Sequence, residues 1–524
     1  MAFEAMMGEA NIEQNLERFL LVLSVSLGVA TLPQIFGWFR RIPYTLLLVI
    51  VGLGLALVDV RLVNLSPGLI LFIFLPPLLF EAAWNLKWSN LRRDLVPICL
   101  YAIIGVLVSI VGVALGLHQI AGISLATALL IGASLSATDP ISVIALFREL
   151  GVDKRLSTLM EGESLFNDGM AVVAFSFLVA SSLGIETLAV RPVLVQFFTV
   201  VGIGLGVGCL IGYGISYLTQ RFDLPLVEQS LTLVSAYGCY IITEELGGSG
   251  VIGVVTAGLI LGNFGSRIGM NPRTRIIVSE FWEFLAFFVN SIVFLLIGDQ
   301  IEFTALQEDI EIVLITIAIM ILMRLISVYG LAFLCNRVFK SDISLPDQTI
   351  LWWGGLRGSV SIALALSVPT TLQDRDEVIA AVFGVVLFTL LVQGLTIQPL
   401  LKHLNLLGDQ PIRQEYAELI ARRAALNRVA QHLDQMEKRP EIEPDFYRLQ
   451  TALVKGELER VEEAIETLIH ENPSIQSYTS DQLRSELLAI EADTYAEFVR
   501  AGRLNQELSP MLQLVFDGES SEYG

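Results

Sequence analysis

Charged residues are scarce in this chain of 524 residues: they make up 16% of it, against 54% apolar residues, and the mean hydropathy is +0.66. Soluble domains carry about 25% charged residues, so the composition excludes an ordinary soluble enzyme. A bilayer core about 30 Å thick needs roughly 20 apolar residues per helical span. The long apolar runs therefore predict an all-α polytopic membrane protein.

Cysteine is also rare, and the four cysteines lie far apart without forming a C-x-x-C pair: Cys99, Cys209, Cys239 and Cys335. We expect neither disulfides nor a structural metal site. The first nineteen residues hold four glutamates ahead of one arginine, whereas a signal peptide starts with a basic stretch, so we expect no cleavable signal. The C-terminal part has no phosphate-loop, EF-hand or nucleic-acid motif, and we expect no cofactor and no nucleic-acid partner.

Hydropathy divides the membrane part into thirteen predicted spans. Their ranges are 17–38, 43–59, 66–84, 95–117, 123–147, 157–183, 193–219, 226–244, 250–263, 276–298, 311–335, 349–369 and 378–401. Loops on one side of the membrane hold fourteen Lys and Arg residues, and the other side, with the N-terminus, holds four. Because cytoplasmic loops carry the excess, we expect an extracytoplasmic N-terminus at 1–16, a transmembrane domain at 17–401 and a cytoplasmic C-terminus.

Residues 402–524 differ in kind from the rest, since they hold 13 Lys or Arg and 23 Asp or Glu, which is half of the chain's net charge of −20. Apolar residues recur there at helical spacing between prolines. We expect an acidic tail of two or three amphipathic helices, either a small helical bundle or a regulatory domain.

A small, clustered set of ionisable residues is expected at bilayer depth: Glu81, Asp139, Glu163, Asp168, Arg324 and Arg357. A charge at the centre of a span costs about 2.5 to 3.5 kcal/mol on insertion scales, so such residues indicate function. The acids outnumber the arginines by two, or by one without Glu81, which lies near a span end and can reach water. One or two carboxylates are therefore left for a movable cation.

The spacing of these residues predicts a cation site. Ser164 and Asp168 are four residues apart and share a helix face, whereas Glu163 and Asn167 lie on the adjacent stripe. Pro140 disfavours helical geometry at Asp139, so the span should break there and free backbone carbonyls.

The hydroxyl of Ser164, the carboxylates of Asp168 and Asp139 and the carbonyl of Thr138 form an all-oxygen ligand set suited to Na⁺ or Li⁺. Glu81 is a further candidate for binding the ion. Glu163 is expected to form an ion pair with Arg324 or Arg357, and Asn167 to form a hydrogen bond between helices.

Four motifs together resemble sodium/proton exchangers of the NhaP and NHE type, the electroneutral branch of the monovalent cation/proton antiporters. They are FLPPLLFEAAW at 74–84, ATDP at 137–140, GESLFND at 162–168 and GGLRGSVSIALAL at 354–366. The resemblance implies thirteen spans in six-helix inverted repeats, broken helices that cross at mid-membrane, a homodimer, and an elevator-like movement of a core domain.

The resemblance also implies roles for single residues. It makes Asp168 the residue that binds the cation or the proton, with Asp139, Ser164 and the backbone of Thr138 as co-ligands. Glu163 resembles the acid that pairs with an intramembrane arginine, Arg324 first and Arg357 second. Asn167 stands where electrogenic relatives carry a second aspartate, which implies one-for-one exchange.

The predicted function is secondary transport, the exchange of Na⁺ or Li⁺ for H⁺. We expect the protein in a bacterial plasma membrane, with a role in pH homeostasis and salt tolerance. Exchange of K⁺ for H⁺ and a passive cation channel are the alternatives. An intramembrane aspartyl protease using Asp139 and Asp168 is a rival from another class, but the Gly-x-Gly-Asp signature is absent and the arginines would have no role.

Overall fold

The computed structural model describes residues 2–36, 42–58, 62, 66–183, 190–221, 224–301, 303–372, 374–407, 410–436 and 444–472, and short stretches between 475 and 512. The chain forms two compact units, one of residues 1–148 and 152–406 and the other of residues 149–151 and 407–524.

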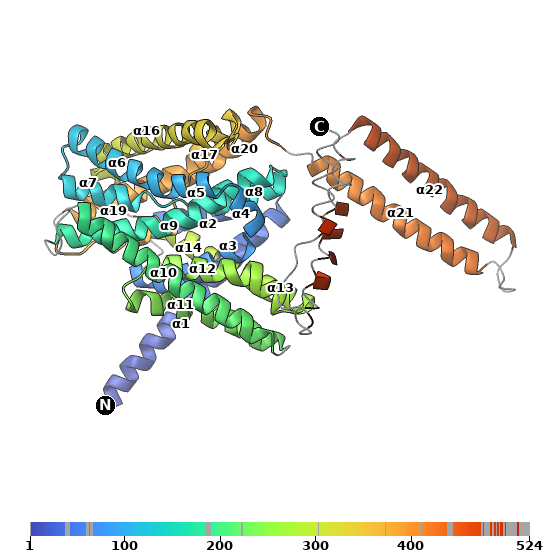
Figure 1. Cartoon of the computed structure of the whole chain (residues 1–524), viewed down its shortest axis with the longest axis horizontal. Helices are drawn as coiled ribbons and strands as arrows, with labels where there is room; N and C mark the ends of the chain where they lie inside the picture. Colours follow the sequence, from blue (N-terminus) through green and yellow to red (C-terminus); the bar gives the residue numbers. More distant parts are fainter. Residues whose placement is uncertain are drawn as a thin grey trace. The chain divides into compact units, whose positions relative to one another are not determined.

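All regular secondary structure in the described part of the first unit is helical (Figure 1). Its helices are α1 (Ala2–Ile35), α2 (Tyr44–Leu57), α3 (Leu75–Asn85), α4 (Trp88–Arg93), α5 (Leu95–Leu100), α6 (Val106–Ile120), α7 (Leu125–Ser134), α8 (Ile141–Leu150), α9 (Lys154–Ser182), α10 (Val190–Thr219), α11 (Pro225–Glu245), α12 (Gly250–Ile260), α13 (Ser266–Ile268), α14 (Pro272–Asp299), α15 (Phe303–Glu308), α16 (Ile310–Leu334), α17 (Leu345–Trp353), α18 (Ser359–Leu366), α19 (Arg375–Phe388) and α20 (Gly394–His403). Five π-helical segments continue or precede some of them: η2 (Leu69–Phe74), η3 (Tyr101–Gly105), η4 (Leu261–Gly265), η5 (Cys335–Phe339) and η6 (Thr389–Gln393).

Within the described residues, eight helical segments are long and apolar enough to cross a membrane. They are Leu16–Pro33, Leu95–Ile120, Lys154–Ser182, Val193–Thr219, Gly250–Ile268, Pro272–Asp299, Ile310–Phe339 and Arg375–His403. Shorter apolar helices are Tyr44–Leu57, Leu69–Asn85 and Leu125–Ser134. Every one of the thirteen predicted ranges contains helix, but several are short, interrupted or more polar, so the count of thirteen stays a prediction.

Local sequence signals explain where many of these helices begin. The side chains of Ser124, Asp153, Ser249 and Asn271 accept a hydrogen bond from a backbone N–H in the first turn of α7, α9, α12 and α14 respectively. Ser344 and the Asp347 carboxylate form a capping box at the start of α17. The polar residues between apolar runs therefore fix the ends of the buried helices.

Two helix pairs are interrupted: Pro140 predicts the first break, and the family resemblance implies both. The chain leaves helical geometry between α7 and α8, before Ile141, and again between α17 and α18, before Ser359. The breaks cross each other: the Asp139 N–H donates to the carbonyl of Leu356 at 2.8 Å. One backbone hydrogen bond thus joins segments more than 200 residues apart in the sequence.

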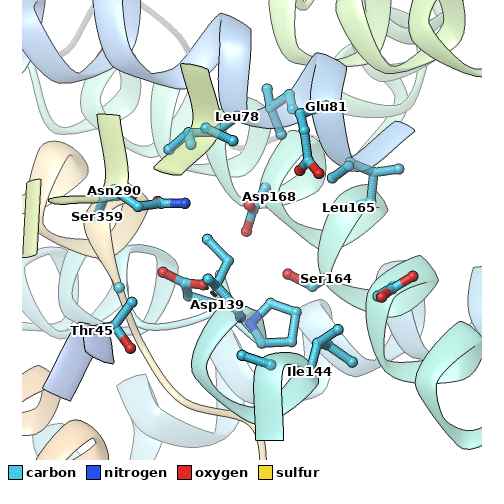
Figure 2. A pocket seen from close by; sticks show the side chains of 18 of the residues that line it. Thr45, Leu78, Glu81, Asp139, Ile144, Ser164, Leu165, Asp168, Asn290 and Ser359 are labelled. Carbon is cyan, nitrogen blue, oxygen red and sulfur yellow. Dashed lines mark hydrogen bonds between the residues drawn. The ribbon is translucent and has the colours of Figure 1, made fainter. Parts of the chain in front are cut away.

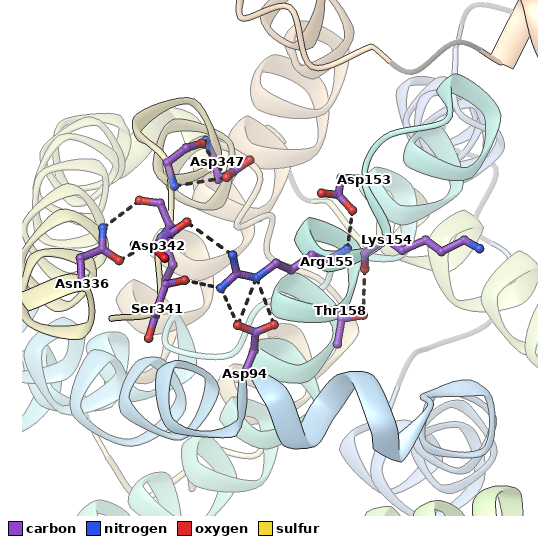
Figure 3. A network of polar contacts seen from close by, with 11 residues as sticks. Asp94, Asp153, Lys154, Arg155, Thr158, Asn336, Ser341, Asp342 and Asp347 are labelled. Atoms are coloured by element: carbon purple, nitrogen blue, oxygen red, sulfur yellow. Dashed lines mark hydrogen bonds and ion pairs between the residues drawn. The ribbon is translucent and has the colours of Figure 1, made fainter. Parts of the chain in front are cut away.

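The start of α9, the helix that carries Ser164 and Asp168, is held by a polar network (Figure 3). The Arg155 guanidinium donates to the buried Asp94 carboxylate, with Nη2 at 2.7 Å, and to the carbonyls of Ser341 and Asp342. Asp94 precedes α5, and the two carbonyls lie between η5 and α17. Two segments distant in the sequence therefore fix the position of α9 along its axis.

The second unit contains α21 (Gln410–Met436) and α22 (Pro444–Glu471), which pack side by side as a helical hairpin (Figure 1). These are two of the two or three helices that the sequence predicts for the tail, and the rest of the tail lies largely outside the described residues.

Candidate functional site

A cavity of about 360 Å³ lies beside the crossing of the two breaks (Figure 2). All five residues predicted to bind the ion line this cavity: Glu81, Thr138, Asp139, Ser164 and Asp168. Glu163, Asn167, Arg324 and Arg357 are not among its lining residues. The fold therefore separates the predicted ligands from the predicted supporting residues.

Asp168 and Ser164 face the cavity from α9, as their four-residue spacing predicts (Figure 2). Asp168 is 9% exposed, and its Oδ1 has no hydrogen-bond partner among the described residues. The Ser164 hydroxyl donates to the Thr138 carbonyl, which leaves the hydroxyl lone pairs for a ligand. A carboxylate oxygen and a hydroxyl oxygen are thus available to a cation on one wall.

Asn167 holds the interrupted segment against α9. Its Nδ2 donates to Thr138 Oγ1 at 2.6 Å, and its Oδ1 accepts from the Thr138 N–H at 3.3 Å. Asn167 is fully buried, and both ends of its amide are occupied by Thr138. This geometry is the hydrogen bond between segments expected of Asn167, and it does not place the amide in the cavity.

Asp139 lies where the two short helices begin. Its Oδ1 accepts from the Ile141 N–H at 3.1 Å, at the start of α8, and Gly358, which precedes α18, lies against its carboxylate. A Cβ atom on Gly358 would overlap that carboxylate, so glycine is required there by the close approach. The N-terminal ends of α8 and α18 therefore both lie beside the Asp139 carboxylate.

Glu163 and Arg324 form a buried two-point ion pair. Arg324 Nη1 lies 2.5 Å from Glu163 Oε1 and Nη2 lies 3.1 Å from Oε2, while Nη2 also donates to the Leu351 carbonyl at 3.0 Å. The structure thus places Arg324, the first of the two expected arginines, beside Glu163.

Arg357 makes a different set of contacts. Its side-chain Nη1 donates to the carbonyls of Ala137 and Ser136 at 3.1 and 3.4 Å. Its backbone N–H donates to Thr389 Oγ1 at 3.1 Å. An interrupted helix leaves carbonyls without intrahelical partners, and Arg357 satisfies two of them. The sequence analysis did not predict this role, although it identified both Arg357 and the free backbone carbonyls at the break before Pro140.

Glu81 lines the same cavity from α3 (Figure 2), and its Oε1 accepts from Asn85 Nδ2 at 2.5 Å. Glu161, Glu283 and Arg148 also line the cavity, and Arg148 Nη2 lies 3.6 Å from Glu161 Oε1. Three carboxylates and one guanidinium, which we call the acidic rim, thus line the same cavity as Asp168. The sequence analysis singled out Glu81 but missed Glu161, Glu283 and Arg148, although Glu161 and Glu283 fall within the predicted spans 157–183 and 276–298.

Two further polar groups of the lining, Thr45 and Asn290, were also missed (Figure 2). Thr45 Oγ1 lies 2.5 Å from Ser142 Oγ, so these hydroxyls satisfy each other. Asn290 is an amide in the apolar run FFVNSIVF of α14. A search for uncharged polar residues within spans would have found both.

The chemistry of this lining suits a hard monovalent cation as cargo. Carboxylate, hydroxyl and carbonyl oxygens are the ligands that such ions prefer. In the part of the chain that the structure describes, no cluster of three or more His, Cys, Asp or Glu residues has the arrangement of a metal site. The cavity is thus suited to a transported ion, in a multi-pass membrane protein built around two crossed helix breaks.

Comparison with known proteins agrees with this class. Residues 22–403 match the family model described as sodium/hydrogen exchanger, transmembrane, and the chain belongs to this family. It is 63% identical over 516 residues to the Na⁺/H⁺ antiporter ApNhaP of Aphanothece halophytica, covering 98% of this chain and 99% of the relative. It is 57% identical over 514 residues to the low-affinity Na⁺/H⁺ antiporter NhaS1 of Synechocystis, covering 97% of each.

The fold is also similar to that of a solved structure, the sodium proton antiporter MjNhaP1 from Methanocaldococcus jannaschii. The TM-score is 0.61 at 20% sequence identity, and the match covers 75% of this chain and 99% of that one. The predicted membership of the antiporter family and the predicted all-helical membrane fold are confirmed, and the family is one of transporters and not of enzymes.

Proposed function

We propose that this protein exchanges Na⁺ or Li⁺ for H⁺ across a membrane, with Asp168 as the residue that carries either the cation or the proton. The observation that supports it most is the buried Asp168 carboxylate, whose Oδ1 lacks a hydrogen-bond partner within the described part of the chain and faces the cavity beside Ser164. The names of the most similar relatives, Na⁺/H⁺ antiporters, support the choice of ions.

Competition for one carboxylate couples the two ions. A bare carboxylate buried at bilayer depth is unfavourable, and either a proton or Na⁺ relieves that cost by neutralising it. Asp139, Ser164 and the carbonyl of Thr138 complete the cation's oxygen ligands, with Glu81 at the approach to the cavity. If only the neutralised site changes sides, by alternating access of a core domain, each Na⁺ moved one way requires a proton moved the other way.

The exchange is proposed to be electroneutral, one ion for one proton. Asn167 is neutral, and its amide is occupied by Thr138, so α9 offers a single titrating aspartate at this level. Each net charge moved would be worth about 2.3 kcal/mol per 100 mV, so a one-for-one exchanger keeps the same end-point gradients at any imposed voltage.

The proposal also covers the membrane in which the protein lies and its orientation there. The excess of Lys and Arg in alternate loops places the N-terminus outside and the acidic tail in the cytoplasm of a bacterial cell, with the protein in the plasma membrane. The homodimer and the elevator-like movement follow the family resemblance. Its role would be pH homeostasis and salt tolerance.

Proteoliposomes containing a pH-sensitive dye test the proposal, with Na⁺, Li⁺, K⁺ and Ca²⁺ added in turn. Na⁺ and Li⁺ should drive proton flux in the wild type, and Asp168→Asn should fold but show none. Asp376→Asn, which alters an aspartate 95% exposed at the start of α19, is the matched control and should exchange normally.

Other outcomes would replace the proposal. Proton flux driven by K⁺ alone would favour the K⁺/H⁺ alternative, and cation conductance without proton movement would favour a channel. Robust exchange by folded Asp168→Asn would remove the mechanism, and end-point gradients that shift under a valinomycin-clamped voltage would contradict electroneutrality.

A further inference from the structure

Asn290 is a polar residue of the cavity to which the exchange mechanism above gives no role. It lies on α14, within an apolar run, and lines the same cavity as Asp139 and Asp168. Figure 2 shows its side chain directed from α14 into the space in front of these two carboxylates. The amide therefore faces the acids from a different helix.

The amide of Asn290 is incompletely satisfied. Its Oδ1 is buried, and no hydrogen-bond partner for it exists among the residues that the structure describes. The next residue differs, since Ser291 Oγ donates to the Phe287 carbonyl at 2.6 Å and lies 2.8 Å from the Tyr44 hydroxyl. Buried polar groups without partners are uncommon, and because this one belongs to a residue that lines a cavity, it points to a ligand there.

The amide group suits a cation site opposite carboxylates. Its carbonyl oxygen is a neutral, hard ligand of the kind that Na⁺ accepts, and its NH₂ group can donate to a carboxylate when the cation is absent. Rotation about χ2, a broad torsion in asparagine, exchanges the two ends of the amide. One side chain can therefore face both the occupied and the empty site.

We propose that Asn290 is a further cation-binding residue, which coordinates the transported ion through its amide oxygen from the wall opposite Asp168 and thereby sets the apparent affinity for Na⁺. This assignment rests on the proposed Na⁺/H⁺ exchange. Because the amide carries no charge, it changes the affinity for the cation and not the ratio of ions exchanged. The ligand set then spans α9, the break before α8, and α14.

The test measures the Na⁺ dependence of proton flux in proteoliposomes for Asn290→Leu, which removes both polar ends at similar volume. Without the amide oxygen, the bound Na⁺ lacks one ligand, so KM for Na⁺ should rise about fivefold or more. The maximal rate should stay within about twofold of the wild type. Ser291→Ala on the same helix is the control, because Ser291 does not line the cavity, and its KM should equal that of the wild type.

Two further measurements keep the test decisive. Asn290→Asp retains an oxygen ligand and adds charge, so its KM for Na⁺ should fall below that of the wild type. Na⁺ should also raise the melting temperature of the wild type in detergent, and Asn290→Leu should need about fivefold more Na⁺ for the same rise. If Asn290→Leu transports too slowly for its KM to be measured, these two measurements still test the assignment of Asn290.

The outcomes separate the two proposals. A wild type with neither Na⁺-driven flux nor Na⁺-dependent stabilisation would overturn the proposed exchange itself. A wild type that exchanges normally, with Asn290→Leu and Asn290→Asp both within twofold of its KM, would overturn the assignment of Asn290 alone.

Discussion

Replacing Glu163 by glutamine should destabilise the protein more than any equally small change in the cavity lining. Glu163 is 2% exposed and Arg324 is 7% exposed, and the pair is joined at two points, 2.5 and 3.1 Å. Glutamine keeps one acceptor for Arg324 but removes the opposite charge. The guanidinium would then retain only the Leu351 carbonyl as a further partner, at 3.0 Å.

The magnitude follows from the uncompensated charge. Breaking a buried ion pair by removing one partner typically costs about 3 to 5 kcal/mol. Asp139→Asn should cost less, because an asparagine oxygen can still accept from the Ile141 N–H and the change removes a charge close to Asp168. Glu163→Gln should therefore lower the melting temperature in detergent more than Asp139→Asn does.

A double-mutant cycle isolates the pair. Unfolding is followed at one scan rate for the wild type, Glu163→Gln, Arg324→Gln and the double variant, since membrane-protein melting is often irreversible. The double variant should be more stable than the sum of the single losses allows, because neither charge is then stranded. Additive losses, or a greater loss for Asp139→Asn, would refute the reasoning, and a raised KM for Na⁺ without a loss of stability would make Glu163 a ligand.

Three further changes test other parts of the site. Gly358→Ala should reduce exchange at least tenfold in a folded protein, because the added methyl would displace the Asp139 carboxylate. Gly456→Ala, whose methyl would meet nothing within 4 Å, is the control and should exchange normally. Equal rates for the two variants would contradict the close approach. Arg148→Gln should lower KM for Na⁺ at low ionic strength, since it removes a positive charge from the acidic rim, and the difference should shrink at high salt. Truncation after Asp409 should leave turnover within a few-fold, because every lining residue of the cavity precedes the tail; a truncated protein that inserts, dimerises and exchanges nothing would contradict this division of the chain.

Local signals account for the part of the fold that could be predicted from sequence. Hydropathy located helix in every predicted range, and the sterics of Pro140 located the break before α8. Helical spacing also separated the two stripes of α9: Ser164 and Asp168 line the cavity, while Glu163 and Asn167 contact other segments. Each of these inferences depends on residues within a few turns of one another.

The remaining features depend on contacts between distant segments. The choice between Arg324 and Arg357 is decided by where α16 and the break before α18 pass α9, which no local pattern encodes. Asn290 could not be placed in the cavity because its position depends on how α14 packs across it. Its signal was present in the sequence, but the search for intramembrane residues considered charge alone.

Arg324 and Arg357 have different partners, and this difference affects the net charge that a bound ion would meet. Arg324 neutralises Glu163, so this pair contributes no net charge to the crossing. Arg357 remains close to the break, where its guanidinium serves the carbonyls of Ala137 and Ser136, and its positive charge offsets one of the two aspartates. With Asp139 and Asp168 both ionised, a single negative charge is left over, which one monovalent cation or one proton cancels. A divalent cation would leave Asp139, Asp168 and Arg357 with a net positive charge, so we propose that charge balance at the crossing favours monovalent ions.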